Sequence, residues 1–225
     1  MTRYGMAIDL RRCIGCQACA AACKMANNLP KELTYNDVAY SVVYTKTDED
    51  WNSFGTAVVK GALANDNAGG TFPNCTLNFL PMQCQHCAEP ACLSACPTGA
   101  TQQREDGIVF VDTDLCVGCE SCIKACPYEG VRSLISDNPE YYLEVEVGEF
   151  DAPPHTPGTV EKCTFCYHRI SAGKEPACMH LCVGRARFWG DLDDPDSEVS
   201  KLIASRSYKQ LLPDMGTKPS VYYLV

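Results

Sequence analysis

The cysteines of this chain are more numerous and more regularly spaced than a hydrophobic core requires. The chain has 225 residues and seventeen cysteines, and sixteen of these fall into four groups of four. Such a density indicates disulfide bonds, zinc sites or iron–sulfur clusters. The groups are Cys13, Cys16, Cys19 and Cys23; Cys84, Cys87, Cys92 and Cys96; Cys116, Cys119, Cys122 and Cys126; and Cys163, Cys166, Cys178 and Cys182. Cys75 is left over, and we expect it to be a free or packed thiol.

The four groups are related in pairs. The first and third share the spacing C-x2-C-x2-C-x3-C, and each cysteine of the third lies 103 positions after its counterpart in the first. The second and fourth both begin C-x2-C, end C-x3-C and contain the tetrapeptide EPAC. The sequence therefore predicts a duplication in which each half carries one compact and one looser group.

The compact spacing matches the ligand requirements of a cubane cluster. Each of the four irons needs one thiolate, and three cysteines at i, i+3 and i+6 on a tight loop can bind three irons of one cluster. The fourth cysteine has by then entered a helix, and in two-cluster ferredoxins it binds the other cluster. Small residues such as Gly15 and Gly118 let the loop close around an inorganic core. Four complete quartets predict four [4Fe-4S] clusters.

Other interpretations of the cysteines are disfavoured. Zinc prefers two separated C-x2-C pairs around one tetrahedral ion, which four consecutive quartets match poorly. The first residues, MTRYGMAIDL, do not resemble a secretory signal, so a disulfide framework is not expected. A formal charge of −9 argues against nucleic acid as a partner. The sequence has no run of eighteen apolar residues, so no direct membrane span is expected.

Short strands and short helices are expected around the cysteine groups. Residues 4–9 and 107–112 are predicted strands that lead into cysteine loops. Short helices are predicted after the loops, at residues 19–25, 92–95, 122–125 and 178–181. Within residues 133–160, the segment YYLEVEV is predicted as a strand.

Towards the end of the sequence a helix and a strand are expected. Ser197 is a predicted N-cap, and Val199, Leu202 and Ile203 would share one face of the helix that follows. VYYLV at residues 221–225 is a predicted strand, which we expect to pack on this chain itself rather than on a partner.

Together these elements predict an α+β fold of duplicated bacterial ferredoxin-like domains, each with two [4Fe-4S] clusters, with surface insertions. Cluster binding should supply folding free energy, so the chain without clusters is expected to be unfolded or molten. The expected division is residues 1–30 with 161–190 as one half, 81–132 as the other, 31–80 and 133–160 as insertions, and 191–225 as a tail of helix and strand.

No catalytic motif is recognisable in this sequence. It contains neither a phosphate-binding P-loop nor a G-x-G-x-x-G that opens a helix. Each iron already has a cysteine, so electron transfer is favoured over catalysis. The histidines are expected beside the clusters or at the surface and not as ligands: His86, His155, His168 and His180. Basic residues near the groups either offset cluster charge or form a solvated surface: Arg11, Arg12, Lys24, Lys162, Arg169 and Lys174.

Several motifs resemble a known family. CPTGA at Cys96–Ala100, CPYEGVR at Cys126–Arg132 and KCTFCYHRISAGKEPAC at Lys162–Cys178 resemble the four-cluster ferredoxin-like subunit (beta subunit) of the dimethyl-sulfoxide-reductase family of molybdenum oxidoreductases. FWGDLDDPDSEVSKL and GTKPSVYYL are most similar to the polysulfide, thiosulfate and arsenate reductase branch. The resemblance covers nearly the whole chain and is weakest at residues 45–80.

The resemblance implies one ligand set for each cluster and an order for the sets. Set 1 faces the catalytic subunit, sets 2 and 3 follow, and set 4 lies at the far end. Set 1 is Cys13, Cys16, Cys19 and Cys182; set 2 is Cys23, Cys163, Cys166 and Cys178; set 3 is Cys84, Cys87, Cys92 and Cys126; and set 4 is Cys96, Cys116, Cys119 and Cys122.

The resemblance also implies the partners. The chain would be a non-catalytic electron-transfer subunit docked on a large catalytic subunit that binds molybdenum or tungsten through two pterin dinucleotides (molybdopterin). A membrane-anchor subunit that reacts with quinone, or a soluble carrier, would be the second redox partner. The complex is expected on the extracytoplasmic side of the membrane, exported with the catalytic subunit, with the cytoplasm as the alternative. Two other functions remain open: a polyferredoxin-like subunit of a hydrogenase or formate dehydrogenase, and a structural zinc-binding module.

Overall fold

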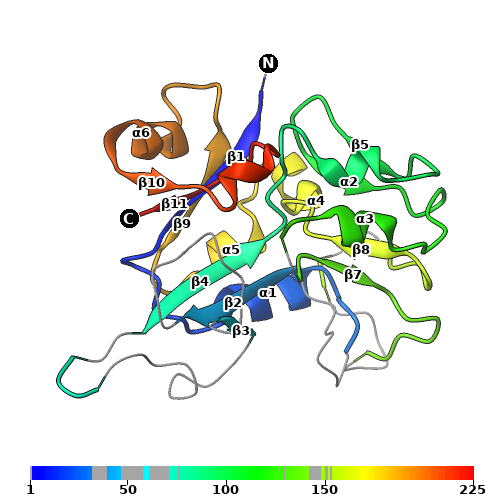
Figure 1. The fold of residues 1–225 in the computed structure, drawn as a ribbon, viewed down its shortest axis with the longest axis horizontal. Coiled ribbons are helices and arrows are strands. Elements are labelled where there is room, and N and C mark those ends of the chain that lie inside the picture. Colours follow the sequence, from blue (N-terminus) through cyan, green and yellow to red (C-terminus); the bar gives the residue numbers. More distant parts are fainter. Residues whose placement is uncertain are drawn as a thin grey trace.

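Short strands and helices alternate through the protein, which confirms a mixed α+β fold (Figure 1). The structure, a computed structural model, describes residues 2–31, 40–46, 58–60, 71–74, 77–128, 130–141, 148–149, 152 and 154–225. The predicted strand YYLEVEV lies almost entirely outside the described residues, and so does Cys75.

The largest sheet joins the two ends of the sequence. Its strand order is β10 (Tyr208–Lys209), β11 (Val221–Leu224), β1 (Tyr4–Asp9) and β9 (Arg187–Asp191). β1 runs parallel to β11 and antiparallel to β9, and Met6, Ala7 and Ile8 are fully buried. β1 therefore has a neighbouring strand along each edge. Because β9 follows Cys182, its pairing with β1 holds the first cysteine loop close to that segment. The expectation that the last strand packs on the chain itself is confirmed.

The predicted helix after Ser197 is also confirmed. It is α6 (Glu198–Ser205), and the Ser197 hydroxyl accepts a hydrogen bond from the Ser200 backbone N–H at 3.2 Å, as an N-cap does. Val199 is fully buried, and Leu202 and Ile203 pack in the same cluster against the four-stranded sheet. α6 therefore closes the outer face of that sheet, at the left in Figure 1.

Three smaller sheets complete the strand content of the described residues. A three-stranded sheet has the order β3 (Val58–Lys60), β2 (Ser41–Lys46) and β4 (Asn78–Gln83). Two hairpins pair β5 (Thr101–Gln103) with β6 (Val109–Val111), and β7 (Arg132–Leu134) with β8 (Val160–Lys162). β2 lies in the range predicted as a surface insertion, yet Val42 and Val43 are buried and β2 pairs with β4 along its whole length. This part of residues 31–80 belongs to the core.

The helices pack in two pairs that join different cysteine groups. α1 (Ala18–Ala26) contacts α5 (Ala177–His180), and α2 (Ala91–Ser94) contacts α3 (Ser121–Ala125). The first pair thus joins groups one and four, and the second joins groups two and three. A further helix, α4 (Tyr167–Ser171), and a 3-10 turn at Pro213–Met215 lie outside these pairs.

The two compact loops have matching backbone conformations. Gly15 and Gly118 have φ angles of 67° and 66°, and Gln17 and Glu120 have 62° and 58°. A Cβ at Gly15 would overlap the Phe79 ring, and a Cβ at Gly118 would overlap the Gly158 carbonyl oxygen. Only glycine fits both the positive φ and the close approach. The matched loops and matched helix pairs support the predicted duplication, which stays a prediction.

Candidate iron–sulfur centres

Cysteines from the first and fourth groups converge around Cys23. Burial raises the pKa of the Cys23 thiol well above its usual value, and repulsion from Cys166, Cys163 and Cys178 raises it further. Cys23 is on α1 and Cys178 is on α5, so the helix pair brings these thiols together. Three cysteines of the fourth group thus meet one cysteine of a compact group, as expected if the last cysteine of a compact group binds the other cluster of its half.

The first three cysteines of group one lie beside Cys182 of the fourth group. Cys13, Cys16, Cys19 and Cys182 line one small cavity. Burial raises the pKa of Cys13, and repulsion from Cys19 and Cys182 also contributes. The backbone N–H of Ala186 donates to the Cys182 Sγ at 3.2 Å, as expected for a thiolate ligand.

Two further convergences involve the second and third groups. Burial raises the pKa of Cys87 to about 12, and repulsion from Cys84, Cys126 and Cys92 contributes. Cys119 lies near Cys96, and Cys116 and Cys122 pack in one apolar cluster. These contacts agree with the four sets that the family resemblance implies, and the assignment of the cysteines to sets and as ligands stays a prediction.

The residues fit cubane clusters better than single metal ions. In the part of the chain that the structure describes, no three His, Cys, Asp or Glu side chains are placed to hold one metal ion. A tetrahedral zinc site needs such a compact set, whereas a cubane holds its cysteines apart around eight inorganic atoms. Backbone N–H groups of Thr101, Val160 and Phe165 donate to Cys96, Cys116 and Cys163 Sγ, each at 3.4 Å. Such donors suit thiolates that carry cluster charge.

The four sets differ in exposure. All cysteines of set 2 are buried, and in set 3 only Cys126 is partly exposed. Sets 1 and 4 contain Cys16 and Cys119, the two exposed thiols among the described cysteines. Sets 2 and 3 adjoin one another, since Cys84 contributes to the raised pKa of Cys163. Sets 2 and 3 are therefore the inner sets, buried except at Cys126, and sets 1 and 4 are the outer sets, each with one exposed thiol.

Two aromatic rings lie at the junction between the inner sets. His86 and Phe165 occupy the same position in two C-x2-C loops, and both have positive φ. Their rings stack with centroids 3.8 Å apart. Burial, with repulsion from Lys162 and Arg132, holds the pKa of His86 well below its usual value. Its Nδ1 accepts the Val109 N–H at 3.1 Å, so the neutral ring carries its proton on Nε2.

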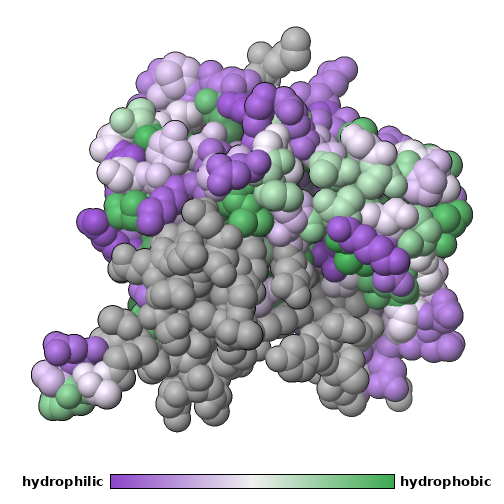
Figure 2. Space-filling view, in the orientation of Figure 1, coloured by the Kyte–Doolittle hydropathy of each residue, from purple (hydrophilic) through white to green (hydrophobic). Residues whose placement is uncertain are grey.

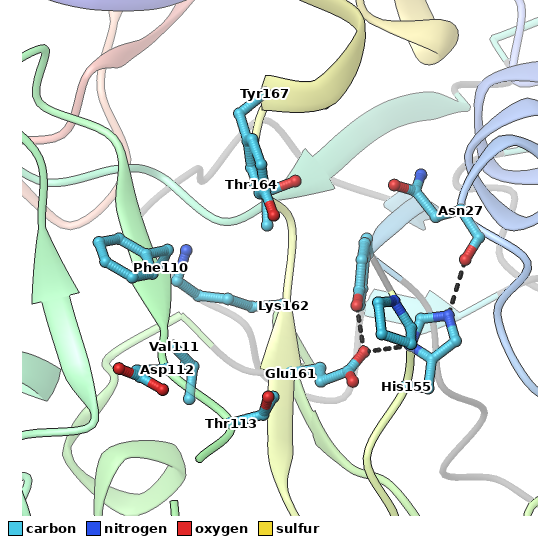
Figure 3. Close-up of a pocket in the computed structure, with 12 residues that line it drawn as sticks. Asn27, Phe110, Val111, Asp112, Thr113, His155, Glu161, Lys162, Thr164 and Tyr167 are labelled. Carbon is cyan, nitrogen blue, oxygen red and sulfur yellow. Dashed lines mark hydrogen bonds and ion pairs between the residues drawn. The ribbon is translucent and has the colours of Figure 1, made fainter. Parts of the chain in front are cut away.

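The remaining histidines lie in different surroundings. His168 is buried, and His180 is exposed with its Nδ1 3.5 Å from a Glu175 carboxylate oxygen. His155 lies beside a pocket next to β8 (Figure 3). Its Nδ1 lies 2.6 Å from Glu161 Oε2 and its Nε2 lies 2.7 Å from the Asn27 carbonyl oxygen. The expectation that the histidines are not ligands stays a prediction.

Sequence reasoning missed two buried arginines. Arg132 and Arg187 are the first residues of β7 and β9, and both are buried against cysteine sulfur. Lys162, which is predicted to lie near the clusters, is buried too. Arg11, Arg12 and Lys174 are exposed, Lys24 is partly buried, and Arg169 is buried against Glu149. One signal could have identified both arginines. Each begins the first strand after the last cysteine of its half, Cys126 for Arg132 and Cys182 for Arg187.

Comparisons with known proteins agree with this geometry. Residues 75–138 and 152–192 match the family described as 4Fe-4S dicluster domain. The chain is 42% identical over 224 residues to a Halobacterium salinarum protein provisionally named as an iron–sulfur subunit of dimethyl sulfoxide reductase, with 100% of this chain and 79% of that protein covered.

Two further relatives show the same relation. One of the subunits of the tetrathionate reductase of Salmonella typhimurium is 38% identical over 224 residues, which cover 99% of this chain and 72% of the relative. The arsenate respiratory reductase iron–sulfur subunit of Shewanella sp. is 34% identical over 251 residues, which cover 99% and 96%. The zinc-module alternative finds no support in these relatives. The chain therefore belongs to the iron–sulfur subunits of the dimethyl-sulfoxide-reductase family, which are electron-transfer proteins that carry [4Fe-4S] clusters.

Proposed function

We propose that this chain relays electrons through four [4Fe-4S] clusters between a large molybdenum or tungsten pterin subunit and a second redox partner. The observation that carries the proposal is the burial of the sixteen cysteines: seven of the eight in sets 2 and 3 are buried, whereas sets 1 and 4 each contain one exposed thiol. Each cluster would supply a one-electron redox centre. The protein would hold the four centres in line and exclude water from the middle two.

The proposed ligands are the four sets defined above. Sets 1 and 2 would belong to the half formed by residues 1–30 and 161–190, and sets 3 and 4 to the half formed by residues 81–132. The packing of α1 on α5 and of α2 on α3 supports this division. The tail at residues 191–225 adds α6 and β11, which fasten the first half.

Both exposed ends carry apolar side chains that suit protein partners. Ile14, Leu181 and Val183 are exposed next to cysteines of set 1. Leu115 and Val117 are exposed on either side of Cys116 of set 4, and Leu93, three residues before Cys96, is exposed too. Figure 2 shows apolar residues gathered at the right, over the region of α2, α3 and β5. Because exposed apolar patches commonly mark interfaces, both ends are suited to docking.

The direction of the relay rests on the family. Set 1 would face the pterin subunit, and set 4 would face a membrane-anchor subunit that reacts with quinone or a soluble carrier. No helix among the described residues is long and apolar enough to cross a bilayer. We place the complex on the extracytoplasmic side of the membrane by co-export with the catalytic subunit, and a partner without an export signal would place it in the cytoplasm.

Iron analysis and native mass spectrometry test the proposal. Anaerobically purified complex should contain about sixteen irons and sixteen labile sulfides for each copy of this chain, after correction for clusters in its partners. A value near half of this would contradict the four-cluster assignment. The mass spectrum should show a large pterin-binding partner, whereas a hydrogenase subunit in its place would support the polyferredoxin alternative.

A further inference from the structure

Three buried cations lie among the cysteines without a carboxylate partner. Arg132, Lys162 and Arg187 are 6%, 2% and 3% exposed. Within the described residues, none of them forms an ion pair with Asp or Glu, whereas buried Arg169 pairs with Glu149. A buried charge is costly unless an opposite charge compensates it. The negative groups around these three cations are therefore the cysteine sulfurs.

Arg187 lies between sets 1 and 2. Its Nη1 donates to Gln83 Oε1 at 3.0 Å and lies 3.7 Å from the Cys178 Sγ, and its Nη2 donates to Ser41 Oγ at 3.2 Å. Burial disfavours the charged form, but Cys19 of set 1 and Cys178 of set 2 together raise the pKa of Arg187. The same guanidinium also lines the cavity of set 1.

Arg132 holds the equivalent place between sets 3 and 4. Its Nη2 donates to the Cys92 Sγ at 2.7 Å. Burial disfavours the charge, whereas Cys92 and Cys84 of set 3 and Cys122 of set 4 raise the pKa of Arg132. Its Nε and Nη1 are buried without a hydrogen-bond partner. Unsatisfied buried N–H groups beside thiolates are donors in need of an acceptor, and cluster sulfides are such acceptors.

Lys162 completes the series at the junction of sets 2 and 3. Its Nζ donates to the carbonyl oxygens of Val109 and Cys163, and its charge acts on Cys92. In the β7–β8 ladder Lys162 lies directly opposite Arg132. Figure 3 shows it on the opposite side of β8 from Glu161. Like charges placed opposite one another are destabilising, so this pair needs the negative charge of the sulfurs nearby.

We propose that Arg187, Lys162 and Arg132 are the counter-cations of the clusters, one at each of the three gaps between successive sets, and that they raise the cluster reduction potentials. The inference rests on the proposed four-cluster function. Reduction adds one negative charge to a cluster, and a fixed buried cation stabilises that charge more than solvent-screened surface cations do. Removal of one cation should therefore lower the potentials of the two clusters beside it and leave the distant pair nearly unchanged.

The test is an anaerobic redox titration of the intact complex, followed by electron paramagnetic resonance. In Arg132→Gln, the ratio of reduced to oxidised cluster at a fixed potential should fall at least tenfold for sets 3 and 4, which is about 59 mV for one electron. Arg187→Gln should shift sets 1 and 2 instead. Lys201→Gln removes an exposed charge on α6 and should shift neither pair.

Charge-conserving variants separate an electrostatic role from a structural one. Arg132→Lys should keep its iron and recover most of the potential lost in Arg132→Gln. Unchanged potentials in an Arg132→Gln protein with full iron content would overturn the proposal. If Arg132→Gln loses iron, Arg132→Lys decides: loss of iron from that variant as well would mean that shape rather than charge matters. A wild-type iron content far below sixteen would instead contradict the proposed function.

Discussion

The inner and outer cysteine sets use the same sequence patterns in different surroundings. Burial raises the pKa of Cys126 and of Cys87 in set 3 to about 12, and that of Cys178 in set 2 to about 11. In set 4, Cys96 is only slightly buried, and hydrogen bonds from the Thr101 N–H and from Thr98 lower its pKa to about 7. Spacing therefore specifies which thiols meet, and the surrounding packing determines how they behave.

The difference follows from where the apolar residues lie. Cys23, Cys84, Cys87, Cys163 and Cys178 belong to the main hydrophobic cluster, together with Met6, Leu80 and Phe165. Cys16 and Cys119 are on loops at the surface. The inner sets are part of the core, so loss of a cluster there removes core volume as well as a redox centre.

The largest expected effect comes from an inner ligand. Cys163→Ser should lose the set 2 cluster and most of the cooperative fold, because a structural metal site supplies on the order of 10 kcal/mol, comparable to the whole stability of a domain at about 5–15 kcal/mol. Cys119→Ser, at an outer set, should lose at most one cluster and keep the fold. Iron content and far-ultraviolet circular dichroism measure both. Equal damage in the two variants would contradict the distinction between inner and outer sets.

Limited oxidation should separate the sets by rate. After brief treatment of the intact protein with ferricyanide, iodoacetamide at pH 7 should label Cys96 and Cys119 about tenfold faster than Cys87 and Cys126, because labelling follows exposure and thiolate content. Mass spectrometry of peptides gives the order. Simultaneous labelling of all four cysteines would mean that the clusters are lost together and that the outer sets are not independent.

A pH-dependent effect is expected next to set 2. Burial lowers the pKa of His155, but Glu161 and the Asn27 carbonyl outweigh it, so the folded pKa is raised above the ordinary value. Both ring nitrogens face acceptors, so the ring carries a proton on each and is a cation, and Tyr40 also donates to Glu161. The stabilisation is complete below pH ~6.5 and is lost as pH rises through the higher folded value.

The melting temperature measures this contribution. A hydrogen bond to a charged group is worth about 2 kcal/mol, which for this size is about 5 °C. The wild type should lose about that much between pH 6 and pH 9, and His155→Gln should lose less over the same range. His180→Gln changes an exposed histidine and should follow the wild type. If the melting temperature changed with pH in the same way in the wild type and in His155→Gln, the His155 ring would not be the proposed cation.

The smallest effect is predicted at Cys75. Because this cysteine belongs to no quartet, Cys75→Ser should keep the full iron content and unchanged reduction potentials. The matched substitution Cys87→Ser, within set 3, should lose iron. Loss of one cluster's iron from Cys75→Ser would show that a ligand set has been assigned wrongly.

Sequence reasoning was most successful where the signal is local. The strand before Cys13 matches β1 at both ends, and the N-cap at Ser197 is formed as predicted. The buried part of residues 31–80 was missed because Val42 and Val43 are adjacent and therefore lack the alternation of a half-exposed strand. Arg132 and Arg187 were missed because what makes them unusual is burial against sulfur supplied by cysteines elsewhere in the chain, which no local pattern records.

The pairing of β1 with both β9 and β11 has a consequence for biosynthesis. Synthesis proceeds from the amino end, so β1 leaves the ribosome long before either of its neighbours exists. Residues 84–126 form contacts that are close in sequence and can assemble first, whereas the half closed by β1 must wait for residues 187–224. During that interval Cys13, Cys16 and Cys19 have no fourth partner, so insertion of the cluster nearest the amino end is expected to be the last step of maturation.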